Sequence, residues 1–253
     1  MTRARFALAA AAVAALAVPV AAQRGPAPSA THLPTDVLKL ACAPRVTAKE
    51  PPMPLRVTGG QDSFVRENYQ PGDLVTINAG RSSGIAVGQE FYVRRIETEY
   101  QLPVSAREPG IIKTAGWIRV WAVDDHLSLA TIEHACDVIT VGDYLEPFAL
   151  PTVPAVASEK PKAERDNYAR VLRGNDNRRT FGTGDFFTID RGSSKGIAPG
   201  AQFVVYRDKQ LKDNFLYELG EAVAVDVTPD SATLQVTMSR DEFETGDYVA
   251  MRK

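Results

Sequence analysis

The chain contains one sequence unit twice, and this duplication constrains the fold more than any other feature. Residues 72–95 read GDLVTINAGRSSGIAVGQEFYVRR and residues 184–207 read GDFFTIDRGSSKGIAPGAQFVVYR, with 13 of 24 positions identical in an ungapped alignment. The blocks that start at Gly116 and Gly220 also match, and both end in Gly-Asp-Tyr. The first copy has eight more residues between its blocks, which predicts an inserted loop over residues 98–115. A repeat of this kind predicts two copies of one fold.

Each copy has the sequence pattern of a small β-barrel. The β-branched or aromatic runs at 74–77 and 186–189 are bounded by turn residues, which is typical of strands. Further strands are predicted at 117–123, 127–133, 221–227 and 231–237, with closing strands that begin at Tyr144 and Tyr248. Closing a short sheet removes its open edges. The expected fold class is therefore all-β, with two tandem small β-barrel-like domains.

Six glycines occupy matching positions in the two copies: Gly80, Gly84 and Gly88, then Gly192, Gly196 and Gly200. We predict structural turns at these positions, because glycine adopts positive φ without a Cβ clash. A phosphate-binding loop is the alternative, but its Gly-Lys-Ser/Thr ending is missing. Occurrence in both copies favours the turns.

The segments outside the repeats differ from them in composition. Residues 1–22 are typical of a signal peptide, with Arg3 and Arg5 before an apolar run and small residues before Gln23. We expect a loose N-terminal arm at 23–54, a first β-barrel repeat at 55–148, a Pro/Ala-rich linker at 149–168 and a second repeat at 169–253.

Charge and hydropathy limit the partners. The net charge is -2, and loss of Arg3 and Arg5 leaves 27 basic against 31 acidic residues, or -4. A nucleic-acid binder needs a dense basic face, so no nucleic acid is expected. The apolar run of the leader is shorter than the about 20 residues that a spanning helix needs. We expect no transmembrane segment after signal removal, and a periplasmic or outer-membrane-associated location.

Cys42 and Cys136 form an even pair in a chain with an export signal, which predicts a disulfide. The alternative is a soft metal site that uses Cys136 and His134, which lie two residues apart and would share a strand face. Zinc takes three or four protein ligands, and no others are nearby in the sequence. We therefore expect no metal and no cofactor.

Trp117, Arg119 and Trp121 alternate along one predicted strand and would share one face of it. Two tryptophans on one face can stack on sugars or on a partner protein. The alternative is a core or interdomain contact beneath the 98–115 insertion. These three residues are the candidate binding surface.

Residues with catalytic potential occur outside known catalytic patterns. Asp124, Asp125 and His126 are adjacent and precede Ser128, but the second copy has Thr-Pro-Asp at the matching place. The sequence has no Gly-x-Ser-x-Gly elbow and no His-Glu-x-x-His motif. Each of four Gly-Asp pairs precedes an apolar strand, where the carboxylate can accept nearby backbone N–H groups rather than bind calcium. We expect a protein that is not an enzyme.

The repeated pattern Gly-Asp-x-x-x-Ile-x-x-Gly-x-x-x-Gly-Ile-x-x-Gly-x-x-Phe-x-Val resembles the C-terminal domain of the flagellar assembly protein T. It is also similar to β modules that lie beside LysM peptidoglycan-binding domains in exported bacterial proteins. The resemblance covers both repeats and implies an assembly or scaffold part of the bacterial envelope. No LysM-like or flagellum-specific segment is visible in the sequence.

These observations predict an exported, non-enzymatic envelope protein that acts as a protein-interaction or scaffold module with an envelope protein as partner. The alternative is a module that binds glycan or peptidoglycan, for which the two tryptophans would be the platform. A periplasmic hydrolase is the remote alternative.

Overall fold

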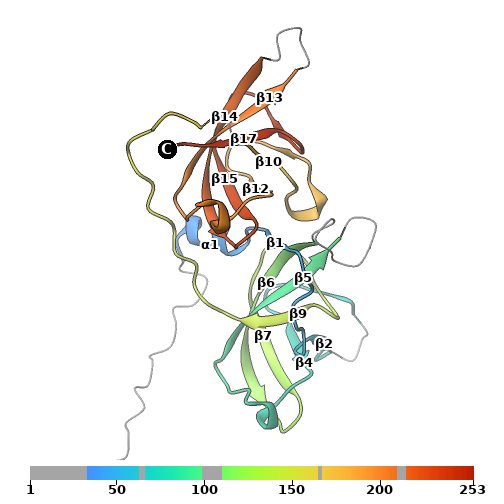
Figure 1. The fold of residues 1–253 in the computed structure, drawn as a ribbon. Helices are drawn as coiled ribbons and strands as arrows, with labels where there is room; N and C mark the ends of the chain where they lie inside the picture. Colours follow the sequence, from blue (N-terminus) through green and yellow to red (C-terminus); the bar gives the residue numbers. More distant parts are fainter. Residues whose placement is uncertain (1–32, 63–65, 99–109, 165–166, 210–214) are drawn as a thin grey trace, which may run out of the picture.

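The computed structural model describes residues 33–62, 66–98, 110–164, 167–209 and 215–253 (Figure 1). Apart from the short helix α1 (Thr35–Ala41) and single 3-10 turns, the regular structure in these ranges is strand. The predicted all-β class is confirmed. Among these residues no helix has the length and apolar character needed to cross a bilayer.

The first copy forms an antiparallel sheet with the strand order β2-β4-β7-β6-β5-β9. Its strands are β2 (Val57–Gly60), β4 (Leu74–Ile77), β5 (Glu90–Glu97), β6 (Gly110–Val123), β7 (Ser128–Ala135) and β9 (Tyr144–Pro147). The two ends of this order meet, because Arg56 forms a bridge with Tyr144 and the Leu145 N–H donates to the Leu55 carbonyl. The sheet is therefore barrel-like.

The second copy has the order β10-β17-β13-β14-β15-β12. Its strands are β10 (Ala169–Arg170), β12 (Phe186–Ile189), β13 (Gln202–Asp208), β14 (Leu216–Val227), β15 (Ala232–Ser239) and β17 (Tyr248–Met251). The ends again meet, through a bridge between Val171 and Ile189. Each copy adds a two-stranded ribbon, from β3 (Asn68–Tyr69) with β8 (Ile139–Thr140) and from β11 (Thr180–Phe181) with β16 (Phe243–Glu244).

Each sheet has its own apolar core. Alternate residues of one strand in each copy point inward: Phe91 and Val93 of β5 pack into the first core, and Phe203 and Val205 of β13 pack into the second. Ile85 and its counterpart Ile197 are buried at the turns, as a residue that seals one end of a barrel should be. The boundaries 55–148 and 169–253 stay predictions, but the two cores match the two repeats.

The turn glycines have the same backbone conformation in both copies. Gly84 has φ 81° and ψ 13°, and Gly196 has φ 80° and ψ 13°. Gly88 and Gly200 have φ of 83° and 88°. These four positions confirm the prediction of turns that require positive φ.

Gly80 and Gly192 need glycine for a different reason from the one predicted. Both have φ of -139°, which is extended backbone. A Cβ on Gly80 would lie 2.2 Å from the carbonyl oxygen of Asp124, and one on Gly192 would lie 2.0 Å from that of Thr228. Close backbone packing against the next hairpin therefore excludes a side chain.

Replacing Gly84 with alanine is expected to lower the free energy of unfolding by about 1–2 kcal/mol. The cause is backbone strain alone, since an added Cβ would meet nothing within 4 Å. The matched control is Gly59→Ala in β2, where a Cβ would make an ordinary 3.5 Å contact with Thr76 Oγ1. Urea denaturation of both variants checks this, and equal stability would contradict it.

The arm before the first sheet is not loose where the structure describes it. After α1, strand β1 (Arg45–Thr47) pairs antiparallel with β6. The second copy contacts the same stretch, because Thr233 Oγ1 donates to the Pro44 carbonyl at 2.5 Å and Asn175 Nδ2 donates to the Cys42 carbonyl at 3.1 Å. Residues 42–47, here called the strap, therefore lie between the two sheets.

The predicted insertion is partly strand. Residues 110–115 extend β6 and pair with the end of β5, with Ile112 opposite Ile96. Residues 99–109 lie outside the described ranges. The prediction of a loop over 98–115 is therefore wrong for its last six positions. Pairing of residues 111–114 with β5 and of residues 110–112 with β1 satisfies backbone groups there.

The Pro/Ala-rich linker has an extended course and docks on the second sheet (Figure 1). Gln202 Nε2 donates to the carbonyls of Ala157 and Glu159 at 2.7 Å and 3.0 Å. Ala163 forms a bridge with Arg252. The part up to residue 164 is therefore a bound segment rather than a free spacer.

Candidate binding surfaces

The three residues of the predicted binding face lie on β6, but the structure separates their environments. Trp117 is 1 % exposed, whereas Trp121 is 62 % exposed. Arg119 lies between them in the strand and is partly buried. One end of the predicted face is therefore closed and the other is open.

Trp117 belongs to a cluster on the outside of the first sheet. Ala41 and Leu38 cover it from α1, and Leu33 covers it from two residues before this helix. Its ring stacks on His134 at 4.5 Å between centroids and on Phe148 at 5.3 Å. Among the described residues the cover thus comes from α1 and Phe148, not from the predicted insertion.

Cys42 and Cys136 form the predicted disulfide, with their Cα atoms 5.6 Å apart. The two residues of the alternative metal site, His134 and Cys136, also lie close together. Their possible ligand atoms and that of Cys42 all lie within 4.8 Å of one another. The disulfide uses both sulfurs, so in this oxidised state His134 is the group left to act as a ligand. Burial lowers the pKa of His134, which favours the neutral ring.

Arg119 is held by two carboxylates. Its Nη2 lies 2.7 Å from Glu90 Oε1, and its Nε lies 3.3 Å from Glu133 Oε1. Burial raises the pKa of Glu90; Arg119 opposes this and Glu133 adds to it. The result is a row of paired side chains beside Trp121, in which burial opposes the ionisation of Glu90 and Arg119 favours it.

The raised pKa of Glu90 gives a signed pH dependence. Folded Glu90 keeps its proton to a higher pH than unfolded Glu90, so protonation of this group favours folding. We expect the free energy of unfolding of the wild type to fall relative to Glu90→Gln as pH rises above the ordinary value of 4.5. Urea denaturation of both proteins across this range measures the difference. A constant difference, or one that grows with pH in favour of the wild type, contradicts the assignment.

A further exposed apolar side chain lies near the Trp121 end of the Glu90–Arg119 row. Val87 is 67 % exposed, and the Gly88 N–H donates to the Val120 carbonyl at 2.8 Å, which places this turn beside the Trp121 backbone. The name Trp121 face is used below for Val87, Gly88, Glu90, Arg119 and Trp121. A large aromatic ring exposed on a strand of a sheet can provide the contact area that dominates a protein interface.

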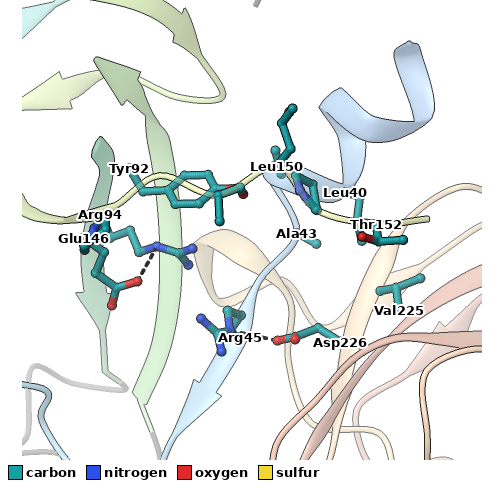
Figure 2. Close-up of a pocket in the computed structure, with 14 residues that line it drawn as sticks. Leu40, Ala43, Arg45, Tyr92, Arg94, Glu146, Leu150, Thr152, Val225 and Asp226 are labelled. Atoms are coloured by element: carbon teal, nitrogen blue, oxygen red, sulfur yellow. Dashed lines mark hydrogen bonds and ion pairs between the residues drawn. The ribbon is translucent and has the colours of Figure 1, made fainter. Parts of the chain in front are cut away.

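A second candidate is a cavity of about 350 Å³ that lies where the two sheets, the strap and the linker meet (Figure 2). The labelled residues come from all of these parts: Leu40, Ala43, Arg45, Tyr92, Arg94, Glu146, Leu150, Thr152, Val225 and Asp226. The sequence did not identify this site, because its walls are far apart in the chain.

The charges around the cavity are paired. Arg94 Nε lies 3.0 Å from Glu146 Oε2, and the Arg94 guanidinium lies 4.4 Å from the centre of the Tyr92 ring. Arg45 Nε lies 2.8 Å from Asp226 Oδ2 and so joins the strap to the second sheet. Burial lowers the pKa of Arg94, and Glu146 opposes that shift. The Arg45–Asp226 pair fits a joint between the two copies, and the Arg94–Glu146 pair lies within the first copy.

The four Gly-Asp carboxylates act in turns, as predicted. Each accepts the backbone N–H of the residue three positions earlier, at 2.7–2.9 Å: Asp73 from Gln70, Asp143 from Thr140, Asp185 from Gly182 and Asp247 from Glu244. Asp143 and Asp247 also receive two hydrogen bonds each, from Arg95 and Arg207. These arginine pairs were not predicted from the sequence, although the two arginines align in the repeat.

The groups considered for catalysis are also engaged in turns. The Ser128 hydroxyl is buried and donates to the Ala79 carbonyl at 2.7 Å. Ser82 Oγ donates to the Asp125 carbonyl at 2.6 Å and lies 3.2 Å from His126 Nδ1. Its counterpart Ser194 makes the same bond to the Pro229 carbonyl without a histidine, so the hydroxyl has a structural use in both copies.

The backbone amides of the glycine segments are occupied as well. The N–H groups of Arg81 and Ser82 donate to the carbonyls of Asp124 and Asp125 at 2.8 Å and 3.0 Å. Ser193 makes the matching bond in the second copy. These amides close the barrel end, which supports the turn over the phosphate loop.

The chain was compared with known proteins. No protein-family model matches it, and no curated protein matches it significantly.

Proposed function

We propose that this protein is an exported, non-enzymatic protein of a bacterial envelope that acts as a protein-interaction or scaffold module. The disulfide fits an oxidising compartment, the periplasm or the outer-membrane surface. The residues that repeat in both copies make turns and hydrogen bonds within the fold, which leaves binding to the surfaces where the copies differ.

The observation that carries the proposal is the exposure of Trp121 on β6, where the pairing with β7 shifts register between Val120 and Ala122. The second copy has Val225 at this position, so the indole is a feature of the first copy alone. Val225 lines the cavity between the sheets, whereas 62 % of Trp121 is exposed. Tryptophan is enriched among residues that dominate protein interfaces.

The second candidate function is glycan or peptidoglycan binding. The same exposed indole favours it, because a flat aromatic face can stack on a sugar ring. Both candidate functions therefore use the same surface, and the following two experiments distinguish them.

Photo-crosslinking tests the protein partner. A benzophenone amino acid is placed at position 121, and in a control at position 215, where Phe215 is also exposed, at 58 %. Irradiation of intact cells followed by mass spectrometry should give specific adducts with an envelope protein from position 121 and not from position 215. Adducts from neither position, or the same adducts from both, contradict the proposal.

Sedimentation with protein-free sacculi tests the glycan partner. The protein-interaction proposal predicts that the mature protein stays in the supernatant. Pelleting that Trp121→Val abolishes would instead establish the glycan function.

A further inference from the structure

The two copies have outer surfaces at equivalent positions, and in the second copy the chain's own linker covers this surface. The linker crosses the second sheet at Gly200, where a Cβ would lie 2.3 Å from the carbonyl oxygen of Ala155 and 3.8 Å from Pro154 Cβ. The next contact is Gln202, whose amide donates to Ala157 and Glu159. Lys160 then pairs with Glu221. This surface binds an extended, proline-containing chain through its backbone.

The matching surface of the first copy has no such cover among the described residues. Gly88 aligns with Gly200 and has nearly the same φ, 83° against 88°. A Cβ on Gly88 would nevertheless meet nothing within 4 Å. The described upstream segment takes a different route, over Trp117 through α1 and on into the strap. The surface that the linker covers at Gly200 in the second copy is therefore uncovered by described residues at Gly88 in the first copy.

We propose that the Trp121 face binds an extended, proline-containing, basic segment of an envelope protein partner. The segment crosses Gly88 as the linker crosses Gly200. This inference rests on the proposed interaction function and names the kind of partner.

The differences between the two surfaces define the chemistry of the segment. Trp121 replaces Val225, and aromatic side chains are the residues that line grooves for proline-rich peptides. The row beside Trp121 contains two carboxylates, Glu90 and Glu133, for the one guanidinium of Arg119. The second copy has the neutral residues Gln202, Val223 and Thr237 at the matching positions. The row therefore has one negative charge in excess, and a segment that carries lysine or arginine complements it.

The test is a binding measurement by fluorescence anisotropy with the mature protein, residues 23–253. The probe is a labelled ten-residue peptide, Lys-Pro-Ala-Pro-Lys-Pro-Ala-Pro-Lys-Pro, and the control peptide has glutamate for lysine. We expect the lysine peptide to bind at least about tenfold more tightly than the glutamate peptide. Trp121→Val should weaken binding at least about tenfold, and Phe215→Ala should leave it unchanged.

Three outcomes overturn the inference. One is no binding of the lysine peptide, and another is equal binding by the wild type and Trp121→Val. The third is that the lysine peptide binds a mature variant in which Arg24, Pro26 and Pro28 are serine but does not bind the wild type. This result would mean that the chain's own N-terminal segment occupies the Trp121 face in the wild type. If crosslinks from position 121 to a protein persist in any of these cases, the interaction function stands and only the extended basic segment fails.

Discussion

Replacing both Cys42 and Cys136 with serine is expected to lower the free energy of unfolding by about 4 kcal/mol. The disulfide closes a loop of 94 residues, and a loop of this length restricts the unfolded chain strongly. Urea denaturation of the double variant and the oxidised wild type measures the difference. Wild type reduced with a dithiol is the control and should match the double variant.

The same change should also loosen the joint between the two copies. The disulfide fixes Cys42 at the start of the strap, and the second sheet contacts the strap through Thr233 and Asn175. Faster amide hydrogen exchange at residues 42–47 is therefore expected in the double variant. A loss of stability below about 1 kcal/mol would contradict this account of the disulfide.

Replacing Asp143 with alanine is expected to cost about 3 kcal/mol of unfolding free energy. Only 2 % of the Asp143 side chain is exposed, and it accepts two hydrogen bonds from Arg95 and one from the Thr140 N–H. Its removal leaves a partly buried guanidinium without its carboxylate and a turn amide without its acceptor. Asp247→Ala should cost a similar amount, because Arg207 and Glu244 N–H take the same places in the second copy.

The matched control is Asp125→Ala. Asp125 also pairs with an arginine, Arg81 at 2.8 Å, but both side chains are 69 % exposed. An exposed pair of this kind contributes less than about 1 kcal/mol. If the two variants are equally stable, the account is wrong that the aspartate of the repeated Gly-Asp-Tyr stabilises the fold as a buried acceptor.

The repeat predicted the strands well because the strand signal is local. The predicted strands at 74–77 and 186–189 coincide with β4 and β12, and 117–123 and 221–227 lie within β6 and β14. Gly84 and Gly196 could also be predicted, since positive φ is a property of the residue itself. The role of Gly80 could not, because it depends on the carbonyl of Asp124, which is brought close only by the fold.

Features that depend on distant contacts were missed. Helix α1 has seven residues and no side-chain cap, so its local signal is weak, and packing on Trp117 supports it instead. That packing also decides why Trp117 is buried and Trp121 is not, although both follow the same alternation in the sequence. The cavity between the sheets depends on the strap, which the composition of the arm did not reveal.

Radical footprinting of Trp121 tests the central claim most directly, namely that the first copy presents an open face for a partner. Purified mature protein and intact cells are exposed to hydroxyl radicals, and oxidation at Trp121 and Phe215 is quantified by mass spectrometry. The account predicts that both residues are oxidised in the purified protein and that Trp121 alone is protected in cells. Equal oxidation of Trp121 in both samples, or protection already in the purified protein, would contradict it.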